Sequence, residues 1–396
     1  MTEDFLFASG SVTAGHPDKL CDQISDAIVD RFLLQDPLSR VAAECAVSKG
    51  VVFVACHFAS QAVVDIPEIA RQLIGQVGYD EERFNPRDCT VMTTLAELPA
   101  GPHARVDERD LDDAGIERIT ATHVANVFGY ACNQTAALMP LPIWLAHKLA
   151  RRLAAVRLQR RLRYLAPDGK TQVAVEYRKR RAHRIHSITL VASQAPGERP
   201  SPARLREDLF ELVLRPALAD EAIGVDDKTL FFVNPEGPAL DGGPSAHSGL
   251  TGRKNADDTY GEFARHSEAA LSGKDPTRID RVGAYAARHA AKNIVAAGLA
   301  DECEVQLSYT IGQTRPVSLW IQTFGTGRAP DEEIAARIER CFDFRPAAIV
   351  RRFRLRELPA VHRGRFYARL AAYGHMGRLD LSLPWEATEM AAALRQ

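Results

Sequence analysis

The sequence predicts an α+β protein in which a helix followed by a β-hairpin occurs three times along the chain. In the first unit, apolar residues recur at helical spacing from Asp18 to Gln35, and Pro37 ends the run. Two β-rich stretches follow within residues 42–59, with Gly50 as the turn between them. This order favours helices that cover one face of mostly antiparallel sheets.

The second and third units repeat this order with different sequences. The expected elements are helices over 134–153 and 279–297, and strands at 172–176, 187–191, 304–311 and 317–323. Gly298 ends the last helix. Alternation in the strand that follows places four side chains on one face: Val305, Leu307, Tyr309 and Ile311.

At 396 residues the chain exceeds the size at which a single hydrophobic core stops growing, so we expect several domains. Boundaries in polar stretches divide it into residues 1–100, 116–233 and 234–380. The stretch 98–115 is rich in Pro, Asp and Gly and is long for a simple connection, so it is a candidate lid over an active site.

Composition excludes several classes of protein. The formal net charge of -1 gives no field that would attract nucleic acid or an anionic membrane, so we expect neither as a partner. The seven cysteines are scattered and contain no CxxC pair, which is typical of reduced thiols. The acidic amino terminus and the lack of a long apolar run predict a cytoplasmic protein.

Gly15-His16-Pro17-Asp18-Lys19 comes directly before the first predicted helix. Its backbone N–H groups, its lysine and the positive end of the helix can converge on one anion. An ordinary helix start would explain Pro17 and Asp18, but it would not explain His16 and Lys19 as well. The pentapeptide alone leaves both interpretations open.

Two later motifs add cations and carboxylates. Residues 249–254 read GLTGRK, and residues 272–276 read SGKDP, with Asp280 at the start of the next helix. A polyphosphate needs several fixed cations, and the magnesium that accompanies it needs carboxylate oxygens. The motifs together therefore indicate a polyphosphate site.

These motifs resemble the S-adenosylmethionine synthetase family in order and spacing, and the similarity covers nearly the whole chain. It is strongest over residues 234–325 and includes the run from Ala284 to Asp301. The resemblance implies three similar α/β domains around a pseudo-threefold axis, active sites between two subunits of a homodimer or tetramer, and magnesium and potassium as cofactors. It implies that a sulfur atom attacks C5′ of ATP, that triphosphate leaves, and that the enzyme then cleaves it to pyrophosphate and phosphate.

Carried over position by position, the resemblance assigns roles to individual residues. The triphosphate contacts would be His16, Lys19, Lys170, Arg253, Lys254 and Lys274, with Arg278 where the family has lysine. His16, Lys170, Arg253 and Lys274 would be catalytic, because displacement by a neutral sulfur needs alignment and cations rather than a general base. Asp18 and Asp280 would hold magnesium and Glu44 potassium.

The sequence departs from the family pattern on the side of the site that binds methionine and adenosine. The positions of this acceptor and adenosine pocket are Gly10, His57, Leu98, His123, Ala239, His247 and Ile311. His57 and His247 stand where the family has carboxylates that pair with the α-ammonium of methionine. A buried ammonium without an anionic partner costs several kcal/mol.

Three hypotheses follow. The first is an ATP-dependent S-adenosyltransferase whose small sulfur-containing acceptor is a methionine analogue without the α-amino group. The second is an authentic S-adenosylmethionine synthetase that uses methionine. The third is a non-catalytic ATP-binding homologue or partner subunit. A metal site made of His57, His123 and His247 has no ligand spacing to support it, because they are far apart in sequence.

Overall fold

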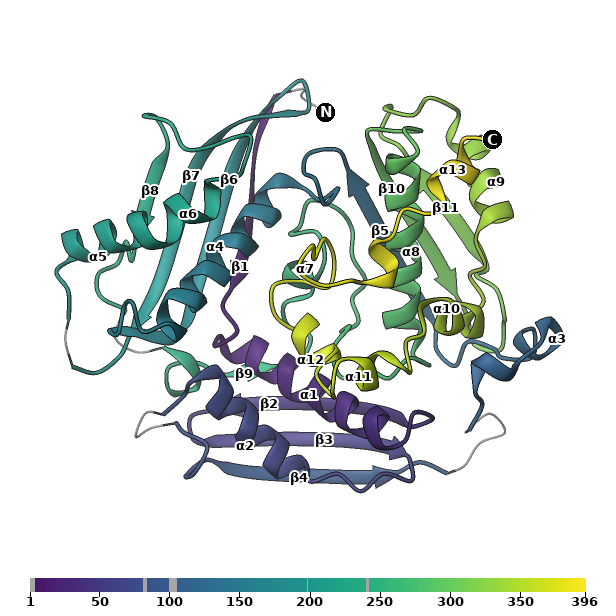
Figure 1. Ribbon diagram of the computed structural model, residues 1–396, viewed down its shortest axis with the longest axis horizontal. Helices are drawn as coiled ribbons and strands as arrows, with labels where there is room; N and C mark the ends of the chain where they lie inside the picture. Colours follow the sequence, from purple (N-terminus) through teal and green to yellow (C-terminus); the bar gives the residue numbers. More distant parts are fainter. Residues whose placement is uncertain (1–3, 81–83, 100–104, 198, 240–241) are drawn as a thin grey trace.

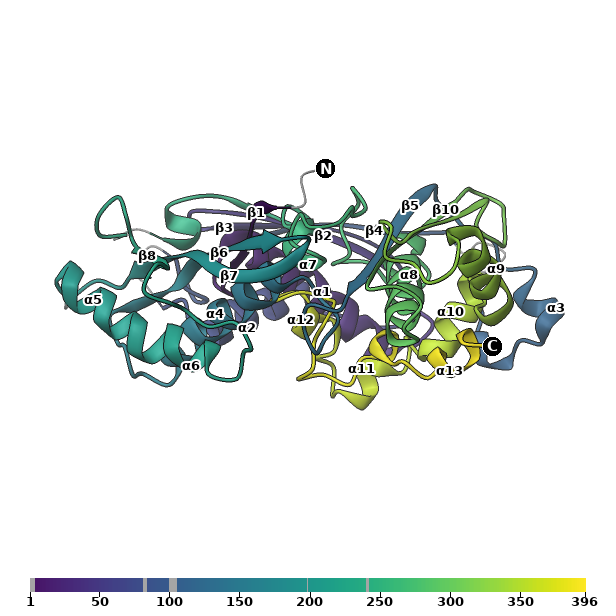
Figure 2. The same ribbon diagram turned by 90° about the horizontal axis from the view of Figure 1, so that it is seen from above.

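A computed structural model describes residues 4–80, 84–99, 105–197, 199–239 and 242–396. Three β-sheets surround a common centre, each with helices packed on it (Figure 1). Seen from above, the sheets lie toward one side of the molecule and most helices toward the other (Figure 2). The predicted α+β class with three units is confirmed.

The N-terminal unit has the sheet order β4-β3-β2-β9, covered by α1 and α2. Its elements are α1 (Pro17–Gln35), β2 (Arg40–Ser48), β3 (Val51–Ala59), α2 (Ile66–Val77), β4 (Thr90–Glu97) and β9 (Gly249–Leu250). Alternation along β3 buries Val52 and Val54 in the core that α1 also enters and leaves Val51 and Phe53 exposed on the other face.

The central unit has the order β1-β6-β7-β8. Its elements are β1 (Phe5–Val12), α4 (Leu141–Leu158), β6 (Leu165–Arg178), β7 (Arg181–Gln194), α5 (Pro202–Leu209), α6 (Arg215–Leu218) and β8 (Leu230–Val233). A π-helical turn, Phe210–Leu214, joins α5 to α6.

The C-terminal unit has the order β11-β10-β5 and packs on α8. Its elements are β5 (Ala125–Cys132), α8 (Ile279–Ala296), β10 (Glu302–Tyr309), β11 (Ser318–Gln322), α9 (Asp331–Cys341) and α10 (Pro346–Phe353). Short helices complete the chain: α3 (Asp113–Ile116), α7 (Asn255–Asp258), α11 (Leu358–Val361), α12 (Tyr367–Leu370) and α13 (Ala391–Leu394).

The three units exchange strands. The first strand, β1, pairs with β6 of the central sheet, β5 pairs with β10 of the C-terminal sheet, and β9 pairs with β2 of the N-terminal sheet. Segments 5–12, 125–132 and 249–250 therefore each complete a sheet on the other side of a predicted boundary. A buried ion pair also links the C-terminal unit to the N-terminal unit: Arg281 of α8 and Asp26 of α1 lie 2.7 Å apart, and both side chains are fully buried.

Two predicted elements need correction. The helix expected over 134–153 begins at Leu141, because Pro140 and Pro142 start a helix but are poorly tolerated inside one. Ile311 lies beyond the end of β10 and is 64% exposed, so it does not share the buried face of Val305, Leu307 and Tyr309.

In the part of the chain that the structure describes, no helix is long and apolar enough to cross a bilayer.

Candidate active site

The turn from β1 into α1 is fixed by local chemistry. His16 caps α1: its Nδ1 accepts a hydrogen bond from the Asp18 N–H at 3.2 Å, and Pro17 occupies the first turn. A Cβ on Gly15 would lie 2.2 Å from the carbonyl oxygen of Pro167, so only glycine fits. The helix-start interpretation is therefore correct as far as it goes, and it orients His16.

Asp18 joins this turn to the GLTGRK segment. Its carboxylate accepts hydrogen bonds from the Leu250 N–H at 3.1 Å, from Lys254 Nζ at 2.8 Å and from Arg253 Nη1 at 3.3 Å. Burial would raise the pKa of the Asp18 carboxyl, but Lys254 and Leu250 hold it below its usual value. Asp18 is therefore an anion that positions two cations.

The two segments touch backbone to backbone. A Cβ on Gly249 would come within 2.2 Å of the Pro17 carbonyl, and the Gly252 N–H donates to Asp22 of α1 at 2.8 Å. The glycines at 249 and 252 thus permit the close approach that brings cations from residues 253–254 onto residues 16–18.

A cavity of about 650 Å³ opens beside these cations. Lys170 of β6, Arg253 and Lys254 line it together with Gly10 of β1. Lys170 and Gly10 are close because Val12 pairs with Lys170, and Gly10 with Gln172. Three of the predicted triphosphate cations therefore meet at one cavity, although Lys170 is far from Arg253 and Lys254 in the sequence.

Lys19 does not line this cavity, and its contact with triphosphate stays a prediction. Its side chain is 1% exposed and forms ion pairs with Asp22 at 2.9 Å and with Asp258. Burial would lower the pKa of Lys19, but Asp22 and Asp258 raise it well above its ordinary value. Lys19 is thus a buried cation held between two carboxyl groups, and burial raises the pKa of Asp258 to about 8.

Lys274, Arg278 and Asp280 form a second cluster at the start of α8. Lys274 Nζ lies 3.1 Å from Asp280 Oδ2, and Arg278 bonds to the ring of His123. Burial, followed by repulsion from Arg278, lowers the pKa of His123, so this ring is neutral at pH 7. None of these four residues lines the 650 Å³ cavity.

Two further predicted positions lie on the exposed face of the N-terminal sheet. Glu44 of β2 and His57 of β3 both point away from α1 into solvent. His57 pairs with Ala42, which also forms an isolated bridge with Lys274, so His57 lies on the side of the second cluster.

The remaining acceptor and adenosine positions are dispersed. Leu98 follows β4 and donates its N–H to the Phe58 carbonyl at 2.7 Å. The Ala239 carbonyl accepts from the Gln194 N–H at 2.8 Å, at the end of β7 in the central unit. Ile311 lies in the C-terminal unit. The seven predicted pocket positions are therefore spread over all three units of one chain.

The candidate lid is partly described. Arg105 forms a two-bonded ion pair with Asp36 at 2.8 and 3.1 Å, and Glu108 forms one with Arg356 at 2.6 and 2.9 Å. Residues 100–104 of this predicted lid lie outside the described residues. The described flank after these residues is therefore tied to the end of α1 and to the chain after α10, and Leu98 on the flank before them bonds to Phe58.

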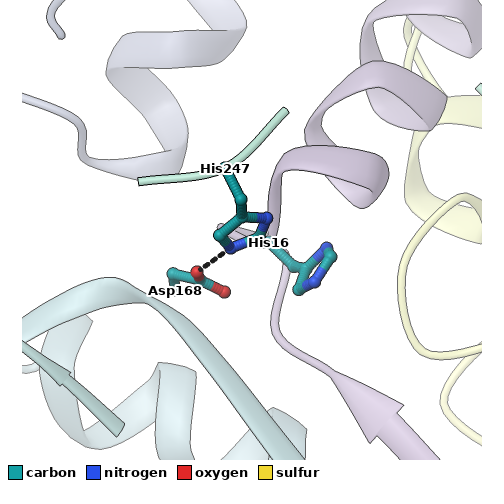
Figure 3. Close-up of side chains that lie close together, drawn as sticks. All are labelled: His16, Asp168 and His247. Atoms are coloured by element: carbon teal, nitrogen blue, oxygen red, sulfur yellow. Dashed lines mark hydrogen bonds and ion pairs between the residues drawn. The ribbon is translucent and has the colours of Figure 1, made fainter. Parts of the chain in front are cut away.

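His16, Asp168 and His247 meet between the N-terminal and central units (Figure 3). His247 Nε2 lies 2.9 Å from Asp168 Oδ2, the two imidazole rings are 5.0 Å apart between centroids, and one ligand atom from each residue lies within 4.8 Å of the others. Burial lowers the pKa of His16 to about 4, so its ring is neutral, and His247 helps hold the pKa of Asp168 below its usual value.

This set of two imidazoles and one carboxylate can hold a divalent metal ion. Sequence reasoning missed Asp168 and placed His247 in the acceptor pocket rather than beside His16. Asp168 lies in β6, two residues before the predicted contact Lys170.

Fold and site together place three cationic side chains at one cavity, an arrangement suited to a polyphosphate. The start of α1 lies beside these cations, and the Asp18 carboxylate holds Arg253 and Lys254 in place.

Comparison with known proteins identifies the family. Models of the N-terminal, central and C-terminal domains of S-adenosylmethionine synthetase match residues 4–99, 118–239 and 241–387. The S-adenosylmethionine synthase of Synechococcus sp. (strain JA-3-3Ab) is 48% identical over 403 residues, which cover 99% of this chain and 97% of the relative. Those of Trichormus variabilis and Gloeobacter violaceus are each 48% identical, over 100% and 99% of this chain and 97% of each relative. The chain belongs to the S-adenosylmethionine synthetase family and is a transferase of the methionine adenosyltransferase type.

Proposed function

We propose that this enzyme joins methionine to the adenosyl group of ATP, with attack of the sulfur on C5′ and release of triphosphate, which it then cleaves to pyrophosphate and phosphate. The observation that carries the proposal is the convergence of Lys170, Arg253 and Lys254 on one cavity, with Asp18 fixing two of them. The near full-length similarity to proteins named S-adenosylmethionine synthase favours methionine over the analogue as the acceptor. It also counts against the non-catalytic hypothesis.

The chain's own residues have two tasks in this reaction. The cations neutralise the charge that grows on the leaving triphosphate, and the cavity aligns the sulfur with C5′. A neutral thioether gives up no proton when it attacks, so no side chain has to act as a general base. His16, neutral because of its low pKa, can donate or accept a hydrogen bond at the phosphates.

Enzymes of this family use divalent and monovalent cations with ATP. In this chain Asp18 and Asp280 fit magnesium, because each is an anionic carboxylate that lies beside a proposed phosphate-binding lysine. When bound, magnesium would supply positive charge to the phosphate oxygens. Glu44, an exposed carboxylate on β2, is the candidate residue for potassium.

The active form is a homodimer or a tetramer built from dimers. The sheet faces turned away from the helices carry exposed large apolar side chains: Leu6, Val51, Phe53, Met92, Leu230, Phe232 and Leu250. Such a surface favours burial against a second copy. Pairing through these faces would also bring the cations at the 650 Å³ cavity of one chain next to Lys274, Arg278 and Asp280 of the other chain. Within one chain these two groups of residues are separate.

A second candidate keeps the same chemistry with a different acceptor. His57 and His247 stand where the family has carboxylates, and neither a neutral nor a protonated imidazole offers negative charge to an ammonium. An acceptor without the α-amino group would avoid that cost. His247 nevertheless lies against the carboxylate of Asp168, whose Oδ2 is 2.9 Å from His247 Nε2. The other oxygen, Oδ1, is buried and has no hydrogen-bond partner in the described part of the chain.

The test offers the enzyme ATP and magnesium with either methionine or its des-amino analogue, and follows the adenosylated product by mass spectrometry. We expect S-adenosylmethionine and pyrophosphate from the methionine reaction. A product from the analogue alone would favour the second candidate, and no product from either would return the chain to the non-catalytic class. A cytoplasmic location stays a prediction of the sequence.

A further inference from the structure

A second cavity, of about 430 Å³, lies on the helical side of the molecule. Helices α1, α2 and α4 and the segment 363–378 form its walls, and apolar side chains such as Ala27, Leu73 and Ala154 form part of its lining. Its volume is within the range of cavities that bind small molecules. None of the residues that line the 650 Å³ cavity takes part in it.

Arginine dominates this second cavity, and no described carboxylate lines it. Four arginines stand exposed at its rim without an acidic partner among the described residues: Arg31, Arg363, Arg365 and Arg369. Arg365 alone of these has a described side-chain partner, the uncharged Gln76, at 2.8 Å. For a chain with a net charge of -1, this is a strong local excess of positive charge.

Three more arginines lie deeper. Arg151 and Arg378 share one acidic neighbour, Asp380, at 3.2 and 2.8 Å, and Arg157 bonds to the carbonyl of Val77. The Nε atoms of Arg151 and Arg157 are buried and have no hydrogen-bond partner within the described residues. Buried donors without acceptors are costly, which indicates that a ligand supplies the missing acceptors.

The electrostatics of the deeper arginines agree with this. Burial, followed by repulsion from Arg378, lowers the pKa of Arg151, and burial lowers that of Arg157. An anion in the cavity would offset that cost to each guanidinium.

We propose that this cavity binds a small polyphosphate anion of the diphosphate or triphosphate class. Guanidinium groups match phosphate oxygens in pairs, and several of them around an enclosed volume suit a ligand with concentrated charge. The size of the cavity excludes a nucleic acid duplex or a folded partner. The ligand can be free polyphosphate or the polyphosphate part of a nucleotide, which share this chemistry.

The position of the cavity connects it to the active-site turn. Ala14 and Gly15, which precede His16, are part of its wall. The Ala14 N–H donates to Tyr373 Oη at 3.3 Å, Arg151 stacks over the Tyr373 ring at 5.6 Å, and Gln23 Nε2 donates to the Ala14 carbonyl at 2.7 Å. An anion held by Arg151 would therefore act on the backbone that orients His16. That coupling rests on the proposed function, whereas binding itself does not.

Isothermal titration with inorganic pyrophosphate tests the binding. The active-site variant Lys170→Gln, Arg253→Gln, Lys254→Gln removes the three cations that line the other cavity, so the binding that remains reports this cavity. We expect that remaining binding to weaken about tenfold or more when Arg31→Gln and Arg369→Gln are added, because two charge-assisted contacts are lost. The matched control is Arg340→Gln, an exposed arginine of α9 without a described acidic partner, which should leave it unchanged.

Competition with a non-hydrolysable ATP analogue distinguishes the two sources. Displacement of pyrophosphate from the active-site variant identifies the nucleotide's polyphosphate as a ligand, and no displacement identifies free polyphosphate. Two outcomes overturn the proposal: no pyrophosphate binding remains in the active-site variant, or the remaining binding survives the loss of Arg31 and Arg369. Neither arginine has a described side-chain bond, and thermal unfolding of each variant checks that the fold is kept. If pyrophosphate binds in this cavity but the wild-type enzyme forms no adenosylated product from ATP, the proposed function is rejected and the binding proposal stands.

Discussion

Lys19 lies in α1 and Lys254 packs beside it, and the two lysines have different surroundings. Lys19 is 1% exposed between two carboxylates that are themselves buried, Asp22 at 2.9 Å and Asp258. Replacing it by methionine keeps the bulk and removes the charge, which leaves two buried carboxylates without their cation. Breaking a buried pair in this way costs about 3–5 kcal/mol. That is a large share of the roughly 5–15 kcal/mol that holds a native protein together.

Lys254→Met is the matched comparison. Lys254 is 28% exposed, and Asp18 keeps its bonds to Leu250 and Arg253, so we expect a stability loss below about 1 kcal/mol. Its turnover should fall roughly 100- to 1,000-fold, as for other lost donors to a leaving group. Urea unfolding and steady-state turnover of both variants check this. If Lys19→Met kept wild-type stability and lost turnover like Lys254→Met, Lys19 would be a phosphate contact after all.

Three further predictions address metal, assembly and pH. Asp280→Asn should abolish turnover with the fold intact, measured against magnesium concentration, and wild-type turnover at saturating magnesium would refute the metal assignment. Phe53→Asp on the exposed face of β3 should shift the oligomer toward monomer in light scattering at micromolar concentration, whereas Val361→Asp, on α11, should not. The pKa of His16 is lowered from 6.5 to about 4, so the unfolded chain binds the extra proton first and stability falls as pH drops from 6.5 to 4. His16 should account for roughly 3 kcal/mol of the loss in unfolding free energy between pH 7 and pH 4, and the variant His16→Gln should lack this part of the loss. A variant with the same pH dependence as the wild type would contradict the burial argument.

The local parts of the fold were predictable from sequence, and the long-range pairings were not. Helices α1 and α8 follow from apolar periodicity and from Pro37 and Gly298, and their observed bounds differ from the prediction by one residue at one end. The exchange of β1 and β5 between sheets leaves no local signal, because strand partners are chosen by packing over more than a hundred residues.

The site shows the same division. The family resemblance implied that Arg253 and Lys254 share a site with His16, and the structure brings both cations to the turn at His16 through Asp18. The motif does not show burial, so the sequence did not reveal that Lys19 is enclosed by Asp22, one turn further along α1, and by the distant Asp258. The pairing of His247 with Asp168 depends on a contact between two units, which no spacing in the sequence encodes.

The identity of the acceptor is the central claim, and one measurement tests it most directly: kcat/KM for methionine and for its des-amino analogue, with ATP and magnesium saturating and each adenosylated product measured by mass spectrometry. Our proposal predicts that methionine is preferred by about tenfold or more, a difference of about 1.4 kcal/mol in the transition state. The variant His57→Glu, His247→Asp should keep that preference or increase it. A wild-type preference for the analogue that the variant reverses would show that the histidines select an acceptor without an ammonium, and it would contradict the methionine assignment.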